Sequence, residues 1–354
     1  MTKPHSTDLR SRFLGAMYGL AYGDAISFPA LFHRFQSSGI PRRRHNFLWR
    51  ENGDLDNKNI TRLMLPFTHR MAASNLEPSP TDDTEFALLS LKALLNEKES
   101  PTQATFVRIW QDEVLPHADE VRSSFSERSA IENFKMGLQP PATGNDNPLH
   151  YEDSAVARAV PIGLFCAGSP EKAAELAALD AQITQAEDGI YAAQGMAAAI
   201  AVLAGGGPLT EALQQARAQF PADSWIAHGD QKAREALAQA ERPQDMALLL
   251  SKSVINTVYS YGSAAPETFP AALAIVEACD GDLQTACSVA NAIAKSADSV
   301  PAMVGALCGC YQGVDVISPM WRDALSTCRG LCLPSMEGAN LEELTLQLLA
   351  QVPD

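Results

Sequence analysis

The stretch Gly15-Ala-Met-Tyr-Gly19-Leu-Ala-Tyr-Gly23-Asp24-Ala25 carries a glycine at every fourth position. In a helix these glycines share one face, because residues four apart are neighbours on the helix surface. A glycine inside a helix costs up to about 1 kcal/mol relative to alanine, so this face has a specific use. Either a second helix crosses it tightly or a ligand lies on it. Asp24 ends the run, where a carboxylate meets the negative end of the helix dipole and needs a partner.

A second segment, near the other end of the chain, also predicts close helix packing. Asp298-Ser299-Val300-Pro301 combines two residues that cap helix N-termini with a proline suited to the first turn. The helix that follows carries small residues on one face, which is therefore nearly bare: Ala302, Gly305, Ala306 and Gly309. Backbones can approach closely on such a face, as the interior of a large helical bundle requires.

Helical periodicity continues through almost the whole chain. Apolar residues recur at helix spacing in Ala- and Leu-rich blocks at 171–181, 189–204, 209–218, 231–240, 243–258, 268–279, 282–294 and 301–312. Breakers separate such blocks at Pro78–Pro80, Pro140–Pro141, Gly205–Pro208, Pro221, Pro266 and Pro270. The alternation typical of strands is scarce, and no repeat of fixed period indicates a solenoid. We therefore predict a single all-α domain over residues 1–354.

The charge balance restricts the classes of partner. The chain of 354 residues has 27 Lys and Arg against 42 Asp and Glu, which gives 27 − 42 = −15 at pH 7. A hydrophobic fraction of 46% with 19% charged residues is that of a folded protein and excludes global disorder. Nucleic acid and anionic membranes would repel this protein at long range, so we expect neither as a partner. A small anionic ligand is compatible with the charge if its site contains a metal.

The start of the chain and the cysteines predict a cytoplasmic protein. Residues 1–12 are polar and lack the apolar core of a secretory signal, and no apolar run is long enough to span a membrane. Six of the seven cysteines fall in the last quarter, without the paired C-x-x-C spacing of a zinc site. Reduced cysteines that pack as small buried hydrophobes are the simplest interpretation.

Residues 28–70 differ from the rest of the chain. From residue 34 on, this segment is rich in Asn, Arg and Asp, shows little periodicity and contains Arg42-Arg43-Arg44. Long loops in compact domains are often lids or ligand-binding loops. We predict a lid here, and composition alone fits a solvated surface loop equally well.

The segment Thr81-Asp82-Asp83-Thr84 is the densest set of oxygen donors in the sequence. Hard cations such as Mg²⁺ and Mn²⁺ prefer carboxylate and hydroxyl oxygens. The segment also precedes an apolar helix, so Thr81 could be its N-cap and the two aspartates could complement the helix dipole. A cap uses one side chain and this segment offers four, which favours a ligand site.

Two further segments carry weaker signals. Asp153-Ser-Ala-Val-Ala-Arg158-Ala-Val-Pro161-Ile-Gly163 is typical of a loop that enters a helix. Gly205-Gly206-Gly207-Pro208 could be a phosphate-binding loop, but it follows an apolar helix and is better explained as a C-cap and turn.

The order of these motifs resembles the ADP-ribosylglycohydrolase family. The resemblance rests on G-A-M-Y-G-L-A-Y-G-D-A at 15–25, T-D-D-T at 81–84, A-V-A-R-A-V-P-I-G at 155–163 and A-D-S…G-A-L-C-G at 297–309, and it covers about residues 11–325. It implies an orthogonal multi-helix bundle with one or two Mg²⁺ or Mn²⁺ ions in a cleft. It further implies a hydrolase that uses water to cleave the ribosyl glycosidic bond of an ADP-ribosylated protein or small molecule.

The resemblance also assigns site residues. The implied metal ligands are Thr81, Asp82, Asp83, Asp298 and Ser299, and we take Asp83 as the catalytic residue that also activates water. The implied substrate contacts are Asp24, Asp153, Ser154, Arg158, Gln185 and Gly262, with the segment 153–158 on the diphosphate side.

Several polar positions depart from the family pattern. Ser296 replaces the first Asp of the late metal motif, beside Lys295, which removes one negative charge from the predicted second metal site. Leu31 stands where the family commonly has a Glu, and Gln185 where it often has a His. These departures favour an alternative in which the protein binds a nucleotide-like ligand or a protein partner without turnover. The intact motif at 81–84 favours the enzyme.

Overall fold

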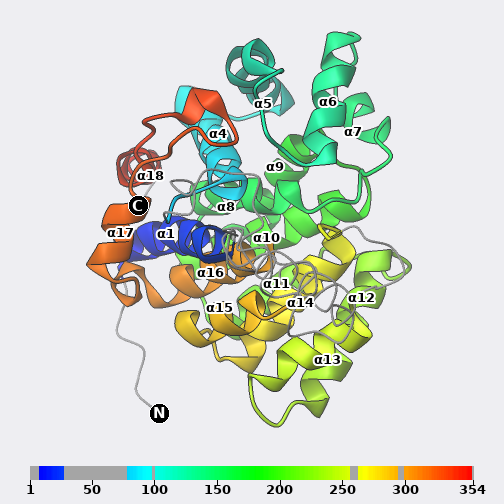
Figure 1. Cartoon of the computed structure of the whole chain (residues 1–354), viewed down its shortest axis with the longest axis vertical. Helices are drawn as coiled ribbons and strands as arrows, with labels where there is room; N and C mark the ends of the chain where they lie inside the picture. The colour runs from blue at the N-terminus through cyan, green and yellow to red at the C-terminus, as the bar shows by residue number, and fades with distance from the viewer. Residues whose placement is uncertain (1–7, 28–77, 98–99, 256–261, 294–298, 353–354) are drawn as a thin grey trace, which may run out of the picture.

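Helix α1 (Leu9–Ser27) crosses the middle of the molecule and packs along α16 (Ser299–Gln312) (Figure 1). The structure is a computed structural model that describes residues 8–27, 78–97, 100–255, 262–293 and 299–352. The two helices meet through the two bare faces: Gly15 lies against Gly309, Gly19 against Gly305, and Gly23 against Pro301. A β-carbon on any of these α1 glycines would overlap the backbone of α16. The glycine face of α1 is thus a helix crossing.

The described residues form helices joined by short turns. The helices after α1 and before α10 are α4 (Asp82–Asn96), α5 (Gln103–Ile109), α6 (Phe125–Lys135), α7 (Ala142–Asn145), α8 (Ser154–Phe165) and α9 (Pro170–Ala181). Those from α10 to α15 are α10 (Asp188–Ala204), α11 (Leu209–Arg217), α12 (Trp225–Gln239), α13 (Asp245–Ser253), α14 (Ala265–Ala278) and α15 (Leu283–Asn291). After α16 come α17 (Pro319–Leu325) and α18 (Leu341–Leu349).

The predicted all-α fold is confirmed. Within the described ranges β-structure is limited to two isolated β-bridges. A short π-helix (Trp110–Val114) continues α5, and 3₁₀ turns follow at Leu115–His117, Val314–Val316 and Pro334–Met336. Most predicted blocks match a helix within a few residues, although α12 begins at Trp225 rather than at 231. None of the described helices is long and apolar enough to cross a membrane.

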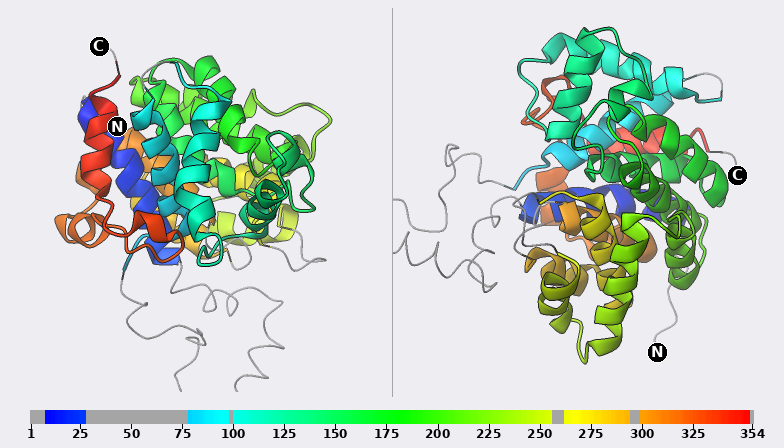
Figure 2. Two further views of the ribbon diagram at one scale, coloured as in Figure 1. Left: turned by 90° about the horizontal axis from the view of Figure 1, so that it is seen from above. Right: turned by 90° about the vertical axis from the view of Figure 1, so that its right-hand side faces the viewer.

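Helix α1 separates two groups of helices (Figures 1 and 2). Helices α4 to α9 lie at one end and α12 to α15 at the other, with α10 and α16 next to α1 in the interior. Buried apolar side chains from α1 to α18 form one continuous cluster. The Ala-rich helix α10 is buried along most of its length, as its composition predicts.

One predicted helix breaker is wrong. Pro270 lies inside α14, whose first turn carries Pro266. Because Pro270 has no N–H, the carbonyl of Pro266 has no partner four residues further along the helix. Gly229 of α12 packs directly against this carbonyl oxygen, where a β-carbon would overlap it. The α14 helix thus continues through its interior proline, and α12 packs closely on the carbonyl that the proline leaves without its helical partner.

The turn at 205–208 ends α10, as predicted. Gly206 has a positive φ of 86°, and the N–H groups of Gly206 and Gly207 donate to the carbonyls of Leu203 and Val202. This is a glycine C-cap of α10.

All seven cysteines lie in the described part of the chain as free thiols, and six of them are buried. The predicted lid at 28–70, with Leu31, and the residues 294–298, with Asp298, lie outside the described residues.

Candidate functional site

Asp24 holds the start of α4 in place. Its carboxylate accepts hydrogen bonds from the N–H of Thr81 (2.8 Å), the N–H of Thr84 (3.3 Å), the hydroxyl of Thr84 (2.6 Å) and the hydroxyl of Thr81. Asp24 is only 2% exposed, so burial raises its pKa while these four bonds oppose the rise. The partner that the sequence predicts for Asp24 is therefore the N-terminus of α4, which is the positive end of that helix dipole.

This contact changes the interpretation of Thr81. Thr81 occupies the N-cap position of α4, but its side chain makes no cap hydrogen bond to the helix. Its hydroxyl donates to Asp24 and lies 3.2 Å from Asp82 Oδ1. Since Asp24 supplies the cap, the carboxylates of Asp82 and Asp83 are not required for it.

Asp82 and Asp83 line a small pocket at the start of α4. The other lining residues come from α4, the segment before and at the start of α6, and the start of α8: Phe86, Ser123, Ser124, Glu127 and Ser154. Its volume of about 20 Å³ accommodates about one water molecule. The structure thus brings three sequence-predicted residues, Asp82, Asp83 and Ser154, to one pocket.

The start of α16 reaches the same end of α1. Gly23 packs on Pro301 and Ala302 of α16, and the next residue, Asp24, caps α4. Ser299, the first residue of α16, is buried, and Asp298 before it lies outside the described residues. Two helix N-termini that carry predicted metal ligands therefore meet at the C-terminal end of α1.

The side-chain oxygens at this site are of the chemical type that a hard cation binds. Asp82 and Asp83 offer carboxylates, and Thr81 and Ser299 offer hydroxyls, which are the donors that Mg²⁺ and Mn²⁺ prefer. Within the described ranges no group of three or more His, Cys, Asp or Glu could by itself hold a metal ion. The described residues thus supply a part of the ligand set that the sequence predicts.

Glu85, one turn into α4, ties the C-terminal region to the site. Its carboxylate accepts the backbone N–H groups of Leu331 (2.9 Å), Cys332 (2.9 Å) and Leu333 (2.7 Å). Burial raises the pKa of Glu85 to about 7, although these three bonds oppose the rise. Glu85 was missed from the sequence, because a Glu in a first helical turn has no feature that indicates a partner 246 residues away.

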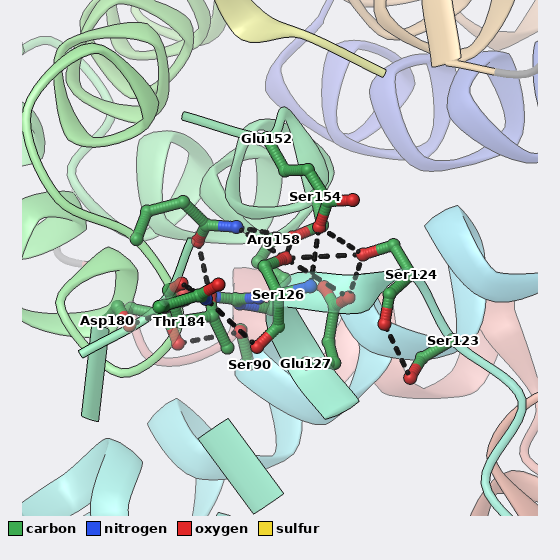
Figure 3. Close-up of polar contacts among 12 residues, drawn as sticks. Ser90, Ser123, Ser124, Ser126, Glu127, Glu152, Ser154, Arg158, Asp180 and Thr184 are labelled. Atoms are coloured by element: carbon green, nitrogen blue, oxygen red, sulfur yellow. Dashed lines mark hydrogen bonds and ion pairs between the residues drawn. The ribbon is translucent and has the colours of Figure 1, made fainter. Parts of the chain in front are cut away.

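Arg158 lies behind the pocket (Figure 3). The guanidinium is 0% exposed, stacks 5.5 Å from the centroid of Trp110, and donates to Asp180 (2.8 Å) and to the hydroxyl of Thr184 (2.8 Å). Its Nη1 lies 3.6 Å from Glu127 Oε1. In this structure the predicted substrate contact Arg158 instead joins α6, α8 and α9 under the pocket wall.

Gln185 also lies behind the wall. Its amide Nε2 donates to the hydroxyls of Ser154 (2.6 Å) and Ser126 (3.0 Å), and the residue is fully buried. Ser154 is on the pocket wall, so Gln185 positions a lining residue from behind. The two nitrogens of a histidine are separate ring atoms that point in different directions, whereas the single amide nitrogen of Gln185 donates to both serines.

The segments of Asp153 and Gly262 are neighbours. The N–H of Asp153 donates to the carbonyl of Ser263 (3.0 Å), and Glu152 forms an isolated antiparallel bridge with Ala264. Asp153 is buried at the start of α8, and Gly262 is partly exposed beside it. Two predicted substrate segments, 110 residues apart in the chain, are thereby side by side.

Two buried acids at the site were missed from the sequence. Glu127 lines the pocket, and Glu152 lies directly behind it, joined to it through Ser124 and Ser126 (Figure 3). Ser124 and Glu127 have the spacing of a capping box at the start of α6, which is the one signal that could have drawn attention to them.

These features define an all-α protein with a small pocket at the start of α4 that carboxylate and hydroxyl side chains line, together with Phe86. The chain belongs to the ADP-ribosylglycohydrolase family, whose sequence pattern matches residues 5–353. The fold is also similar to that of a solved structure described as an ADP-ribosylglycohydrolase-related protein complex, with a TM-score of 0.58 and 21% sequence identity. That similarity covers 98% of this chain and 99% of the other. Comparison with proteins of curated function gave no match. The family and fold type predicted from the motifs are therefore confirmed.

Proposed function

We propose that this protein is a metal-dependent glycohydrolase that removes ADP-ribose from a modified protein or small molecule by adding water. The observation that carries the proposal is the meeting of the α4 and α16 N-termini at the end of α1. Asp82, Asp83 and Ser154 line one pocket at the start of α4, together with the buried acid Glu127. The family acts on ADP-ribosylated substrates, and this pocket is the place where such a bond would be cleaved.

The proposed metal ligands are Thr81, Asp82, Asp83, Asp298 and Ser299, for one or two Mg²⁺ or Mn²⁺ ions. A bound divalent cation would offset the charge of the ligand's diphosphate and hold its ribose hydroxyls. This local neutralisation reconciles an anionic substrate with a chain of net charge −15. As a metal ligand, Asp83 would also orient the attacking water and so activate it.

The transition state of such a hydrolysis is oxocarbenium-like, so carboxylates close to the anomeric carbon stabilise it. Asp82, Asp83 and Glu127 provide that negative charge around the pocket. The start of α8, at Asp153 and Ser154, and the neighbouring Gly262 contact the diphosphate side, where backbone N–H groups at a helix N-terminus suit an anion. The free thiols fit a cytoplasmic location.

A binding module without turnover is the second candidate. Ser296 and Leu31 favour it, since each replaces a family acid with a side chain that neither binds a cation strongly nor accepts a proton. Both candidates use the same pocket, so the decisive difference is chemical release of ADP-ribose.

The test is a release assay with peptides that carry ADP-ribosyl-arginine or ADP-ribosyl-serine, in Mg²⁺ or Mn²⁺. The enzyme proposal expects free ADP-ribose, and it expects Asp83→Asn to lower the rate at least about 100-fold, because the variant loses a metal ligand and the carboxylate that orients the water. Asp119→Asn is the matched control, because that carboxylate is 98% exposed and does not line the pocket. Binding of the peptides without release would support the module instead.

A further inference from the structure

We propose that Glu127 and Glu152 share one proton through Ser124 and act as the acid–base pair of the pocket. The inference rests on the proposed glycohydrolase function and adds residues to it that no family motif assigns. Glu127 is the catalytic member, since it lines the pocket, and Glu152 is a positioning residue behind it (Figure 3). The pair would take over the role of the acid that Leu31 replaces.

The count of hydrogens around Ser124 indicates the shared proton. The Ser124 Oγ lies 2.7 Å from Glu152 Oε2 and also contacts Glu127 Oε2 at hydrogen-bond distance. A serine hydroxyl has one hydrogen, so it can donate to only one of two ionised carboxylates. A proton on either acid turns the second contact into an O–H···O hydrogen bond that Ser124 accepts. The geometry is therefore satisfied by one proton on the pair.

The buried charges also favour protonation of the pair. Glu127, Glu152 and Asp180 are each at most 1% exposed, and Arg158, which is 0% exposed, pairs with Glu127 and Asp180. Three ionised carboxylates would leave two buried negative charges without a partner, which is costly in an apolar interior. Burial, and then repulsion by Glu127, raise the pKa of Glu152 to about 7. The charged groups that face Glu127 from the other helices are Arg158, Asp82 and Asp83.

Glu127 lines the pocket with Asp82 and Asp83, which places it beside a ligand bound there. Its Oε1 lies on the Arg158 side, where it is buried and has no hydrogen-bond partner among the described residues. Glu152 Oε1 is likewise without a hydrogen bond, but Glu152 does not reach the pocket wall. The N–H of Ser126 donates to Glu152 Oε2 (2.6 Å) and fixes this carboxyl from the α6 side.

The chemical step needs no further reactant. The oxygen of water forms a bond to the anomeric carbon, and the glycosidic bond breaks with its electron pair going to the leaving atom. Ionised Glu127 takes one proton from the water and passes it to the leaving atom, so the pair ends with the same single proton. Protonated Glu152 keeps Ser124 hydrogen-bonded on both sides throughout, which holds the Glu127 carboxylate in position.

The proton itself is tested without turnover. Infrared spectra of the purified protein near pH 6.5 should show a protonated carboxyl band that is absent from both Glu152→Gln and Glu127→Gln. The matched control Glu132→Gln, on the exposed side of α6, should leave the band unchanged. Circular dichroism and thermal unfolding of each variant confirm that it is folded. A wild-type protein without this band overturns the shared proton, whatever its activity.

The catalytic role is tested by pH profiles of ADP-ribose release. Glu127→Gln should lower the rate 10²- to 10⁴-fold, the range of general acid–base catalysis. Glu152→Gln mimics the protonated acid, so the variant should still release ADP-ribose. Its rate should not fall at alkaline pH, where the wild-type rate falls because the shared proton is lost. A band in the wild type together with undiminished release by Glu127→Gln would reject the catalytic role. A wild type that releases no ADP-ribose refutes the proposed function. In that case the infrared band still shows whether the two acids share a proton.

Discussion

Gly19 of α1 and Gly305 of α16 face each other so closely that a β-carbon on either glycine would lie 2.8 Å from the carbonyl carbon of the other. Each would also overlap the neighbouring carbonyl oxygen. Real β-carbons do not approach backbone this closely, so two whole helices would have to separate. The distance between α1 and α16 matters for function, since Gly23 and Asp24 at the end of α1 position the starts of α16 and α4.

We therefore expect Gly19→Ala to destabilise the protein although alanine favours helix. Overpacking of this kind typically costs about 1–3 kcal/mol or more, which outweighs a gain in helix propensity of up to about 1 kcal/mol. Urea unfolding followed by circular dichroism measures the difference. Gly137→Ala is the control, because its β-carbon would meet nothing, and its cost is confined to a positive φ of 87°. A Gly19→Ala protein as stable as the wild type would contradict the close crossing.

The second prediction concerns Asp24, whose carboxylate accepts four hydrogen bonds from Thr81 and Thr84. In Asp24→Asn one oxygen becomes an NH₂ group that faces these donors, so at least one buried bond is lost. Buried unsatisfied donors cost about 1–3 kcal/mol each. Thermal and urea unfolding should show this loss. Asp282→Asn is the matched control: Asp282 caps α15 through the N–H of Thr285, and asparagine caps a helix nearly as well. Equal costs in the two variants would argue against the special role of Asp24.

The fold followed from the sequence because its signals are local. Glycine and small residues at four-residue spacing marked the two faces that meet at Gly19 and Gly305, and apolar periodicity located the helices. The sequence also showed that Asp24 needed a partner but not which one, since Thr84 lies 60 residues further along the chain. Pro270 was misjudged, because the packing of α12 against this part of α14, where Gly229 lies on the carbonyl of Pro266, cannot be seen from the local sequence.

The candidate site followed only in part, for a related reason. Motifs with internal spacing, such as Asp82-Asp83 and Ser154, were found and do meet at one pocket. Glu127 and Glu152 are joined across separate segments by Ser124, and no spacing along the chain reveals this. Burial is equally hidden, so Arg158 was expected on the ligand side of the wall and lies behind it.

Metal binding gives the third prediction. If Thr81, Asp82 and Asp83 hold Mg²⁺ or Mn²⁺, then a metal concentration of 100 times Kd should raise the free energy of unfolding by about 2.7 kcal/mol. Thermal unfolding with increasing Mn²⁺ measures this, and Asp83→Asn should abolish the shift. Ser296→Asp should increase the affinity, since it adds one negative charge next to Asp298. The exposed-site variant Asp119→Asn should behave as the wild type. If Mn²⁺ stabilised Asp83→Asn as much as the wild type, the metal would not bind in this pocket.

The pH dependence of stability gives the fourth prediction. The pKa of Glu152 in the folded protein is raised to about 7 from 4.5, so the folded state favours the protonated acid. Its stabilising contribution is complete below pH 4.5 and is lost as the pH rises to about 7, on the order of 3 kcal/mol for an isolated group. Urea unfolding at several pH values should show a decline that is smaller in Glu152→Gln. Glu132→Gln keeps the wild-type slope, and identical slopes in all three proteins would contradict a buried protonated Glu152.

The last prediction uses the buried guanidinium of Arg158. Arg158→Met should cost about 3–5 kcal/mol, because it leaves Asp180 and Glu127 buried without their cation. Arg234→Met is the matched control: Arg234 pairs with Asp230 at 2.9 Å but is 57% exposed, so its loss should cost less than about 1 kcal/mol. Urea unfolding at pH 7 compares them. A cost that is equal for the two arginines would mean that Arg158 acts through packing on Trp110 rather than through charge.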